Sequence, residues 1–439
     1  MEVDRGAMGT QSSASVSVDE MKRPHAVIVS PPWPRGGTAR IVQSQVEYYR
    51  SRGYRTIVIC APLQCWWDAA YPEWTTVHEG MAELGADLVY DAAVDGRRFT
   101  LGKYLTWLRR AGQVTALDWI VFTAGSAHVR EEVGRTLKQT NVAVCHVNHV
   151  FTLQFAKRLV EEIGPVGRTI PMIVETHDVQ AHALLERGEL NQWTHRQDSE
   201  SRLVASEIAH LQGAGVLVHL SVTDYEFFKE RMPEKRHILV LPTIEESFVA
   251  RVNEKVSEET IDLLFVGQST DANCAGLGWF FKEVWPALET EKYQVRIVGQ
   301  IDALVREVLP EIYARHRECF TGTVRDLTTY YRASRCVFAP MISGTGISIK
   351  TIEALSLGKP FVGTSKAYRG MPMALIAQEG INAYDTPEAF AQAIRFALSN
   401  GLQVGDAGRR VYEKLFSRDA AFAARDEALN AAVAACAHV

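Results

Sequence analysis

The chain has 439 residues, of which 47% are apolar and 23% are charged, and its net charge is −5 at pH 7. This length is sufficient for two domains with separate cores, and the absence of a basic excess argues against a nucleic-acid partner. The seven cysteines are scattered without a C-x-x-C pair, so neither a zinc ribbon nor a disulfide framework is expected, and a reducing cytoplasm fits best. No apolar run approaches the ~20 residues that a membrane-spanning helix needs.

The first half of the chain alternates short apolar runs with amphipathic stretches. Residues 1–23 lack an apolar signal core and contain GAMGT, so we expect a disordered tail or a cloning scar there. The expected strands are Ala26–Ser30, Thr56–Cys60, Trp119–Thr123, Val142–His146, Met172–Glu175, Gly215–His219 and Ile238–Leu241, with helices such as Ile41–Arg52 and Phe151–Ile163 between them. Nearly continuous apolar strands are typical of parallel sheets covered on both faces.

A polar stretch, Glu245–Thr260, interrupts this alternation and is the expected linker. The expected strands beyond it are Asp262–Val266, Gln294–Gly299, Arg335–Ala339 and Pro360–Gly363, and the Ala-rich stretch Asp419–Ala435 is expected to be helical. We therefore divide the chain into a domain at 24–250, a domain at 251–410 and a C-terminal helix at 411–439. The pattern predicts an α/β protein with two doubly wound, Rossmann-like domains that face an interdomain cleft.

The most informative motif is the segment APMISGTGISIKTIEALSLGKPFVG at residues 339–363. An apolar strand is followed by a Ser-Gly-Thr-Gly turn and then at once by a helix, whose unpaired N–H groups and positive end favour an anion. Helical spacing places Gly346, Lys350 and Glu353 on one face, which suits a nucleotide diphosphate with hydroxyl groups beside it. An ordinary βα connection followed by a solvated Lys350–Glu353 pair is the alternative interpretation.

Histidines follow two strands of the first half, in the segments CHVNH and VETHD. Because loops at strand ends often carry function, His146, His149 and His177 are candidate catalytic residues. The alternatives are that the first two only hydrogen-bond loop backbone, and that Asp178 caps the helix that follows it. No nearby ligand set completes a metal site, so we expect a metal-independent protein.

At these residues the chain resembles the retaining glycosyltransferases of the GT-B fold, family 4 in the usual sequence classification. The similarity runs through LLFVGQSTDANCAGLGWFFKEVWPAL, QVRIVG, FTGTVRDLTTYYRAS, the 339–363 segment and EGINAYD, and it is weaker in the first half. The resemblance implies a hexosyltransferase-type enzyme that moves a sugar with retention from a nucleotide sugar, with UDP- and GDP-sugars the leading candidates. The implied acceptor is a glycan, a lipid-linked molecule or another glycoconjugate, as in polysaccharide biosynthesis, and no further cofactor is expected.

The resemblance also implies roles for individual residues. Glu353 matches the glutamate that binds the donor ribose, a role suited to a carboxylate. The complete set of expected donor-binding residues is Gly36, Gly37, Gly267, Gln268, Thr323, Val324, Ser343, Gly344, Thr345, Gly346, Ile347, Lys350 and Glu353. Two departures stand out: Thr345 replaces the first glutamate of the Glu-x7-Glu signature, and Gln268 replaces an arginine. Lys350 is our candidate for the missing positive charge, ahead of Arg35, Arg40 and Arg325.

Three functions remain open from the sequence. The main prediction is a glycosyltransferase; the alternatives are a nucleotide-sugar epimerase or hydrolase of the same fold and a non-catalytic nucleotide-sugar-binding partner. A Trp-rich region with Trp33, Trp66, Trp67 and Trp74 either lines an acceptor pocket or is simply buried. The segment Tyr104–Gln113 is either a solvated helix face or a peripheral contact with the inner face of a membrane.

Overall fold

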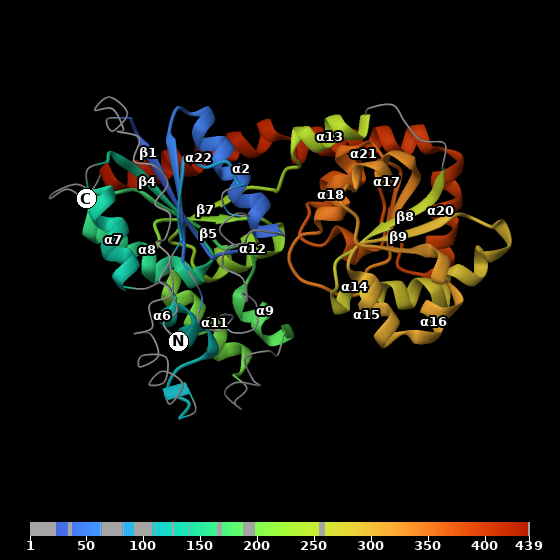
Figure 1. Ribbon diagram of the computed structural model, residues 1–439, viewed down its shortest axis with the longest axis horizontal. Coiled ribbons are helices and arrows are strands. Elements are labelled where there is room, and N and C mark those ends of the chain that lie inside the picture. Colours follow the sequence, from blue (N-terminus) through green and yellow to red (C-terminus); the bar gives the residue numbers. More distant parts are fainter. Residues whose placement is uncertain are drawn as a thin grey trace, which may run out of the picture.

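The computed structural model describes residues 23–33, 37–61, 63, 81, 83–91, 108–109, 111–124, 127–138, 140–164, 169–187, 198–253 and 260–437. These residues form two α/β domains that lie side by side (Figure 1). Each domain is built on a parallel sheet with helices on both faces, as the sequence predicts. Helix α13 (Glu246–Asn253) lies inside the expected linker and runs between the two domains.

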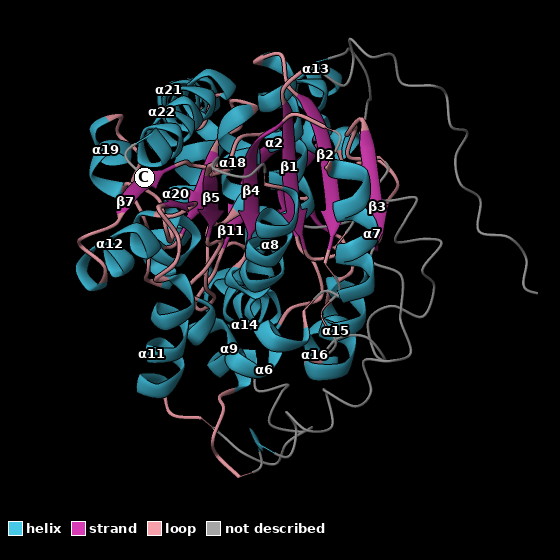
Figure 2. Ribbon diagram, turned by 90° about the vertical axis from the view of Figure 1, so that its left-hand side faces the viewer, coloured by secondary structure: helices cyan, strands magenta, loops and turns pink. Residues whose placement is uncertain are grey.

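The first domain contains a seven-stranded parallel sheet in the order β3-β2-β1-β4-β5-β6-β7. Its strands are β1 (His25–Ser30), β2 (Arg55–Cys60), β3 (Leu88–Asp91), β4 (Val142–Asn148), β5 (Met172–Glu175), β6 (Val216–His219) and β7 (Arg236–Leu239). The helices are α2 (Gly37–Ser51), α6 (Ala116–Thr123), α7 (Ala127–Leu137), α8 (Val150–Ile163), α9 (Gln180–Arg187), α11 (Glu200–Leu211) and α12 (Val222–Arg231). Separate apolar clusters cover the two faces of this sheet, whose strands lie in a row in Figure 2.

The second domain contains a five-stranded parallel sheet in the order β10-β9-β8-β11-β12. Its strands are β8 (Ile261–Val266), β9 (Val295–Val298), β10 (Phe320–Gly322), β11 (Ser334–Ala339) and β12 (Phe361–Gly363). The α-helices are α14 (Asp271–Trp279), α15 (Ile301–Val308), α16 (Pro310–Arg315), α17 (Thr328–Ala333), α18 (Ile349–Ser356), α19 (Met373–Gln378), α20 (Pro387–Ser399) and α21 (Gly401–Leu415). Shorter helical turns are η3 (Phe280–Val284), η4 (Trp285–Ala287), η5 (Glu289–Glu291), η6 (Arg317–Cys319) and η7 (Ser365–Tyr368). One apolar cluster fills this domain.

Most of the expected strands are present, and the main exception is Trp119–Thr123. This apolar run forms most of helix α6, which begins with a capping box between Thr115 and Asp118. Reciprocal bonds between these two residues satisfy helix N–H groups, and this local signal outweighs the strand-like composition. Two short strands, β3 and β10, were not expected, and β7 begins two residues before the expected run at Ile238.

The last helix, α22 (Arg418–Ala437), returns from the second domain to the first. In Figure 1 it runs from the side of the second domain across the top of the first. Its apolar residues join the cluster on one face of the first sheet; they are Ala421, Phe422, Ala428, Leu429 and Ala432. The first domain therefore contains residues from both ends of the chain.

Candidate functional site

The candidate site lies where the carboxyl ends of the central strands of both sheets meet. Strand order reverses between β1 and β4 and between β8 and β11, and ligands of doubly wound sheets bind at such points. The two sets of loops are in contact, since the Val222 N–H donates to the Gly370 carbonyl at 2.8 Å across the domains. A second cross-domain contact joins Arg40 of α2 to Glu353 of α18. The cleft is therefore lined by residues of both domains.

The loop before α18 has a backbone that requires glycine. Gly344 and Gly346 have φ values of 117° and 63°, in a region that L side chains rarely adopt. A Cβ on Gly346 would lie 2.5 Å from Oδ1 of Asp178, which reaches this loop from the first domain. Arg369 holds the loop from its own domain, because its Nε donates to the Thr345 carbonyl at 2.8 Å. The loop is thus braced on one side and closely approached on the other.

Glu353 is buried at the cleft and is hydrogen-bonded by both domains. Its Oε2 accepts from the Tyr331 hydroxyl at 2.7 Å, and its Oε1 accepts from Nη1 of Arg40 at 2.5 Å. Burial and the neighbouring carboxylate of Glu353 raise the pKa of Tyr331, so this phenol remains a donor. Glu353 also borders a cavity of about 150 Å³ together with Arg40, Gln43, Ser44, Glu47, Thr243, Ile244, Glu245, Glu246, Phe248 and Arg418.

Lys350 places a positive charge beside the loop that follows β8. Its Nζ donates to Oδ1 of Asn273 at 2.5 Å and lies 4.3 Å from the centre of the Phe265 ring. The Asn273 side chain in turn donates to the Gln268 carbonyl at 2.9 Å. Burial, followed by repulsion from Arg369, lowers the pKa of Lys350 to about 7. Lys350 is therefore linked through Asn273 to the loop at Gln268, where the resemblance expects a base.

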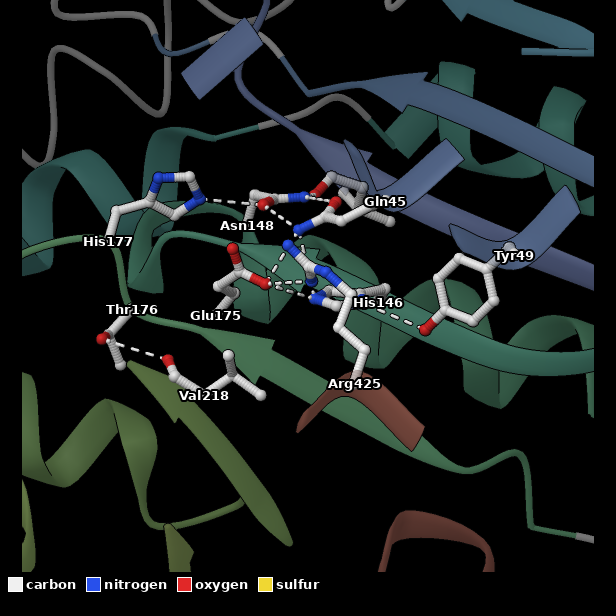
Figure 3. A network of polar contacts seen from close by, with 10 residues as sticks. Gln45, Tyr49, His146, Asn148, Glu175, Thr176, His177, Val218 and Arg425 are labelled. Carbon is white, nitrogen blue, oxygen red and sulfur yellow. Dashed lines mark hydrogen bonds and ion pairs between the residues drawn. The ribbon is translucent and has the colours of Figure 1, made fainter. Parts of the chain in front are cut away.

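His146 belongs to a buried polar network under the cleft (Figure 3). Its Nε2 lies 3.0 Å from Oε2 of Glu175, and its Nδ1 lies 2.9 Å from the Tyr49 hydroxyl. Because a carboxylate only accepts, Nε2 donates to Glu175 and Nδ1 accepts from Tyr49. Both ring nitrogens are thus occupied within the first domain, and we give His146 a supporting role rather than a contact with substrate.

His149 and His177 form a stacked pair at the ends of β4 and β5. Their ring centres are 3.9 Å apart, and their φ values are 63° and 64°. Among the described non-glycine residues, only Lys292 also has a positive φ. Such strained conformations cluster at functional sites. Thr38 Oγ1, in the first turn of α2, lies 3.1 Å from Nε2 of His149, and burial lowers the pKa of His177 to about 4, so its ring is neutral at pH 7.

The other predicted site residues are partly described by the structure. Thr323 and Val324 follow β10, and Gly37 begins α2. Gly267 directly follows β8 and lies close to Gly299, since a Cβ on Gly299 would lie 2.0 Å from the Gly267 carbonyl oxygen. Ser343, Thr345 and Gln268 are exposed, whereas Ile347 packs partly against the core. The predictions for Arg35, Gly36, Trp66, Trp67 and Trp74 fall outside the described residues, as do residues 104–107 and 110 of the segment Tyr104–Gln113. Arg109 of that segment is buried and pairs with Asp198, so this side chain faces neither solvent nor a membrane.

Some functional contacts have weak or no sequence signal. In the first turn of helix α9, the N–H groups of Gln180 and Ala181 donate to Glu207, which lies on α11. Arg369 follows no recognisable motif, and Tyr331 lies in the similar segment FTGTVRDLTTYYRAS but the resemblance implies no role for it. Arg425 does have a signal, because it interrupts the buried stripe of α22 between Phe422 and Leu429.

Two searches of the described residues gave negative results. No group of three or more His, Cys, Asp or Glu side chains is arranged to hold a metal ion within this part of the chain. No helix in the same part is both long and apolar enough to cross a bilayer.

The chain is similar to known glycosyltransferases in one domain by sequence and over its length by structure. Residues 260–400 match the model of the family described as glycosyl transferases group 1, and no curated protein is significantly similar in sequence. A glycosyltransferase from Rickettsia africae ESF-5 has a TM-score of 0.60 at 13% identity, covering 94% of this chain and 99% of that one. Sucrose-phosphate synthase from Thermosynechococcus elongatus has a TM-score of 0.59 at 16% identity, covering 94% and 100%. Anabaena Alr3699/HepE, in complex with UDP and glucose, has a TM-score of 0.58 at 12% identity, covering 92% and 99%.

At these identities the structural comparisons establish the fold, and they confirm the architecture expected from the sequence. The sequence match covers the domain that contains Lys350, Glu353 and the glycine loop. The second domain therefore carries the sequence pattern of glycosyl transferases group 1, and the chain as a whole has the GT-B fold.

Proposed function

We propose that the chain is a retaining glycosyltransferase that binds a nucleotide sugar in the cleft between its domains. The observation that carries this proposal is Glu353, a buried carboxylate that faces the cleft and contacts Arg40 of the opposite domain. In the proposed complex, Glu353 accepts hydrogen bonds from the donor ribose. The family match and the UDP and glucose complex named for Anabaena HepE support a nucleotide-sugar donor.

The diphosphate of the donor would lie against the loop Ser343–Ile347 and the N-terminus of α18. Backbone N–H groups, the helix dipole and the ammonium of Lys350 provide positive potential there without a metal ion. The bond between the anomeric carbon and the diphosphate oxygen breaks, and the acceptor oxygen bonds to the same face of that carbon. The acceptor proton passes to the departing phosphate oxygen. The protein contributes position and charge stabilisation.

In this proposal, Thr345 decides which hydrogen bonds hold the donor sugar. It is exposed on the loop and presents a hydroxyl where the resemblance places a glutamate. We propose that the donor sugar is held there by neutral hydrogen bonds, and that the acceptor is a glycan or lipid-linked molecule. His149 and His177 approach the same cleft from the first domain and are the candidates to contact the reacting sugar.

The proposal is tested with UDP-, GDP-, ADP- and dTDP-sugars. Binding is measured by calorimetry, and released nucleoside diphosphate is measured with and without candidate acceptors. Acceptor-dependent release supports the transferase. Release without acceptor, or interconversion of the sugar, supports a hydrolase or epimerase, and binding without turnover supports a non-catalytic protein.

The substitution Glu353→Gln tests the ribose contact directly. We expect donor affinity to fall roughly ten- to a hundredfold, the usual effect of losing one charged hydrogen bond of about 1.5–3 kcal/mol. Glu413→Gln is the matched control, because this glutamate is exposed on α21 and, among the described residues, pairs with Arg409 one turn away. Equal donor affinity in both variants and the unchanged protein would remove Glu353 from the ribose role.

A further inference from the structure

The buried network beneath the histidine pair links the C-terminal helix to His177 through a chain of hydrogen bonds (Figure 3). Nη1 of Arg425, on α22, donates to Oε2 of Glu175 at 2.8 Å. Gln45 Nε2 donates to the same oxygen at 3.0 Å and to Oδ1 of Asn148 at 2.8 Å. Nε2 of His177 lies 2.8 Å from that Asn148 oxygen. All five side chains are at least nine-tenths buried.

Gln45 and Asn148 form a paired set of amides whose orientation decides what His177 meets. Besides the bond from Gln45 Nε2, the pair contains a return bond from Asn148 Nδ2 to Oε1 of Gln45 at 2.9 Å. If both amides rotated by 180°, the pair would keep both mutual bonds. The two orientations are therefore distinguished only by the groups at the ends of the pair.

The groups at both ends favour the orientation in the structure. At one end the Glu175 carboxylate only accepts, so it requires the NH₂ group of Gln45 to face it. At the other end the carbonyl of Val29 lies 3.4 Å from Nδ2 of Asn148 and would repel an oxygen. Asn148 therefore presents Oδ1 to His177, and an oxygen acceptor requires a proton on Nε2 of that ring.

Arg425 keeps the Glu175 side chain ionised, so that its carboxylate accepts hydrogen bonds. Burial alone would raise the pKa of Glu175, but Arg425 and the His146 bond lower it overall. The other carboxylate oxygen, Oε1, has no hydrogen-bond partner among the described residues, so the charge is compensated through Oε2. Without the guanidinium, burial would favour the protonated form of Glu175, and a proton on Oε2 would require the carbonyl of Gln45 to face it.

Resting on the proposed function, we infer that Arg425 is a positioning residue that holds His177 in its Nε2–H tautomer. Nδ1 of His177 then keeps a lone pair, which accepts a hydrogen bond from a substrate hydroxyl. No described residue hydrogen-bonds Nδ1, and Figure 3 shows this edge of the ring turned away from the network. The charged and titratable groups around the ring are Glu175 on β5, His146 on β4, Arg425 on α22 and the stacked His149. A neutral ring in the wrong tautomer would donate at Nδ1 instead of accepting.

The tautomer is measured directly by NMR on the full chain without donor. The protein is labelled with ¹⁵N-histidine, and the His177 signals are identified by comparison with His177→Gln. We expect a protonated Nε2 and an unprotonated Nδ1 at pH 7. In Arg425→Met we expect the Nδ1–H form to appear as a major species. Glu427→Gln, an exposed charge on the same helix, should leave the His177 signals unchanged.

Two further measurements keep the inference independent of folding and of the proposed function. Gln45→Met breaks the amide pair while Arg425 and Glu175 remain, and only the 3.4 Å contact with the Val29 carbonyl is left to orient Asn148, so it should shift the tautomer even if Arg425→Met does not fold. Once a donor is known, kcat should fall roughly tenfold or more in both variants, while KM for the donor changes less than about twofold. A wild-type Nδ1–H form, unchanged signals in the variants, or a shifted tautomer with unchanged kcat would overturn the inference. Absence of transfer in the wild-type protein would instead count against the proposed function.

Discussion

Lys350 brings a positive charge to a loop that contains no basic residue of its own. The loop after β8 has no basic residue between Gln268 and Leu277, yet an ammonium group lies against it because α18 brings Lys350 to Asn273. The spacing of Gly346, Lys350 and Glu353 identified this face of the helix from sequence. The contact with Asn273 was not predictable, since it depends on how α18 packs against α14.

The lowered pKa of Lys350 gives donor binding a characteristic pH dependence. In the free protein the ammonium is present below about pH 7 and is lost as the pH rises through this value. A diphosphate favours the charged form, so donor affinity should weaken by up to about tenfold per pH unit above pH 7, with proton uptake on binding. Calorimetry in buffers of different ionisation enthalpy measures this uptake.

A variant pair separates Lys350 from other titrating groups. Lys350→Met should weaken donor binding roughly ten- to a hundredfold and abolish the pH slope. Lys366→Met, at an exposed lysine of η7, should preserve both affinity and slope. A slope that persists in Lys350→Met would assign the pH dependence to another residue.

At the scale of elements, α2 of the first domain and α18 of the second are joined by an ion pair. Arg40 and Glu353 belong to different domains and lie 313 positions apart in the chain. The side chain of Arg40 is 42% exposed, so the pair adds little to the stability of either domain. Its effect is to favour the arrangement in which the two helices approach each other.

We therefore expect Arg40→Met to change domain closure more than stability. The free energy of unfolding should change by no more than about 1 kcal/mol, while small-angle scattering should give a larger radius of gyration for the donor-free protein. Arg52→Met, directly after the end of the same helix, is the control, because Arg52 pairs with Asp426 of α22 and not across the cleft. An unchanged radius in Arg40→Met would show that other contacts hold the domains together.

The elements that sequence could predict are those with strong local patterns. Continuous apolar runs identified β1, β2, β4, β5, β6 and most of the second sheet. The run at Trp119 misled because composition was weighed above the capping box at Thr115. Strands β3 and β10, with four and three residues, are too short to show a period. Contacts such as Arg425 with Glu175, 250 positions apart, arise only from the assembled topology.

At the scale of the whole molecule, α22 joins the end of the second domain to the core of the first. This helix begins beside the second domain and places Phe422, Leu429 and three alanines in the core of the first. A fully buried large apolar side chain contributes about 1.5–3 kcal/mol, so the helix supplies several kcal/mol to the first domain. The second domain has its own cluster, which contains no residue of α22.

Deletion of residues 418–439 should therefore damage the domain that is distant in sequence. We expect faster hydrogen exchange in β5, β6 and β7 and a lower melting temperature for the first domain. Strands β8 to β12 should keep their protection. Equal loss of protection in both sheets would mean that the domains do not unfold as separate units.

The return of α22 also imposes an order on biosynthesis. A chain that emerges from the ribosome N-terminus first exposes the seven strands of its first sheet long before the helix that covers one of their faces is made. Domains usually fold as they appear, but this one stays incomplete until α22 has been made. The second domain lies later in the sequence. All the residues of its own core are nevertheless made before α22 completes the core of the first domain.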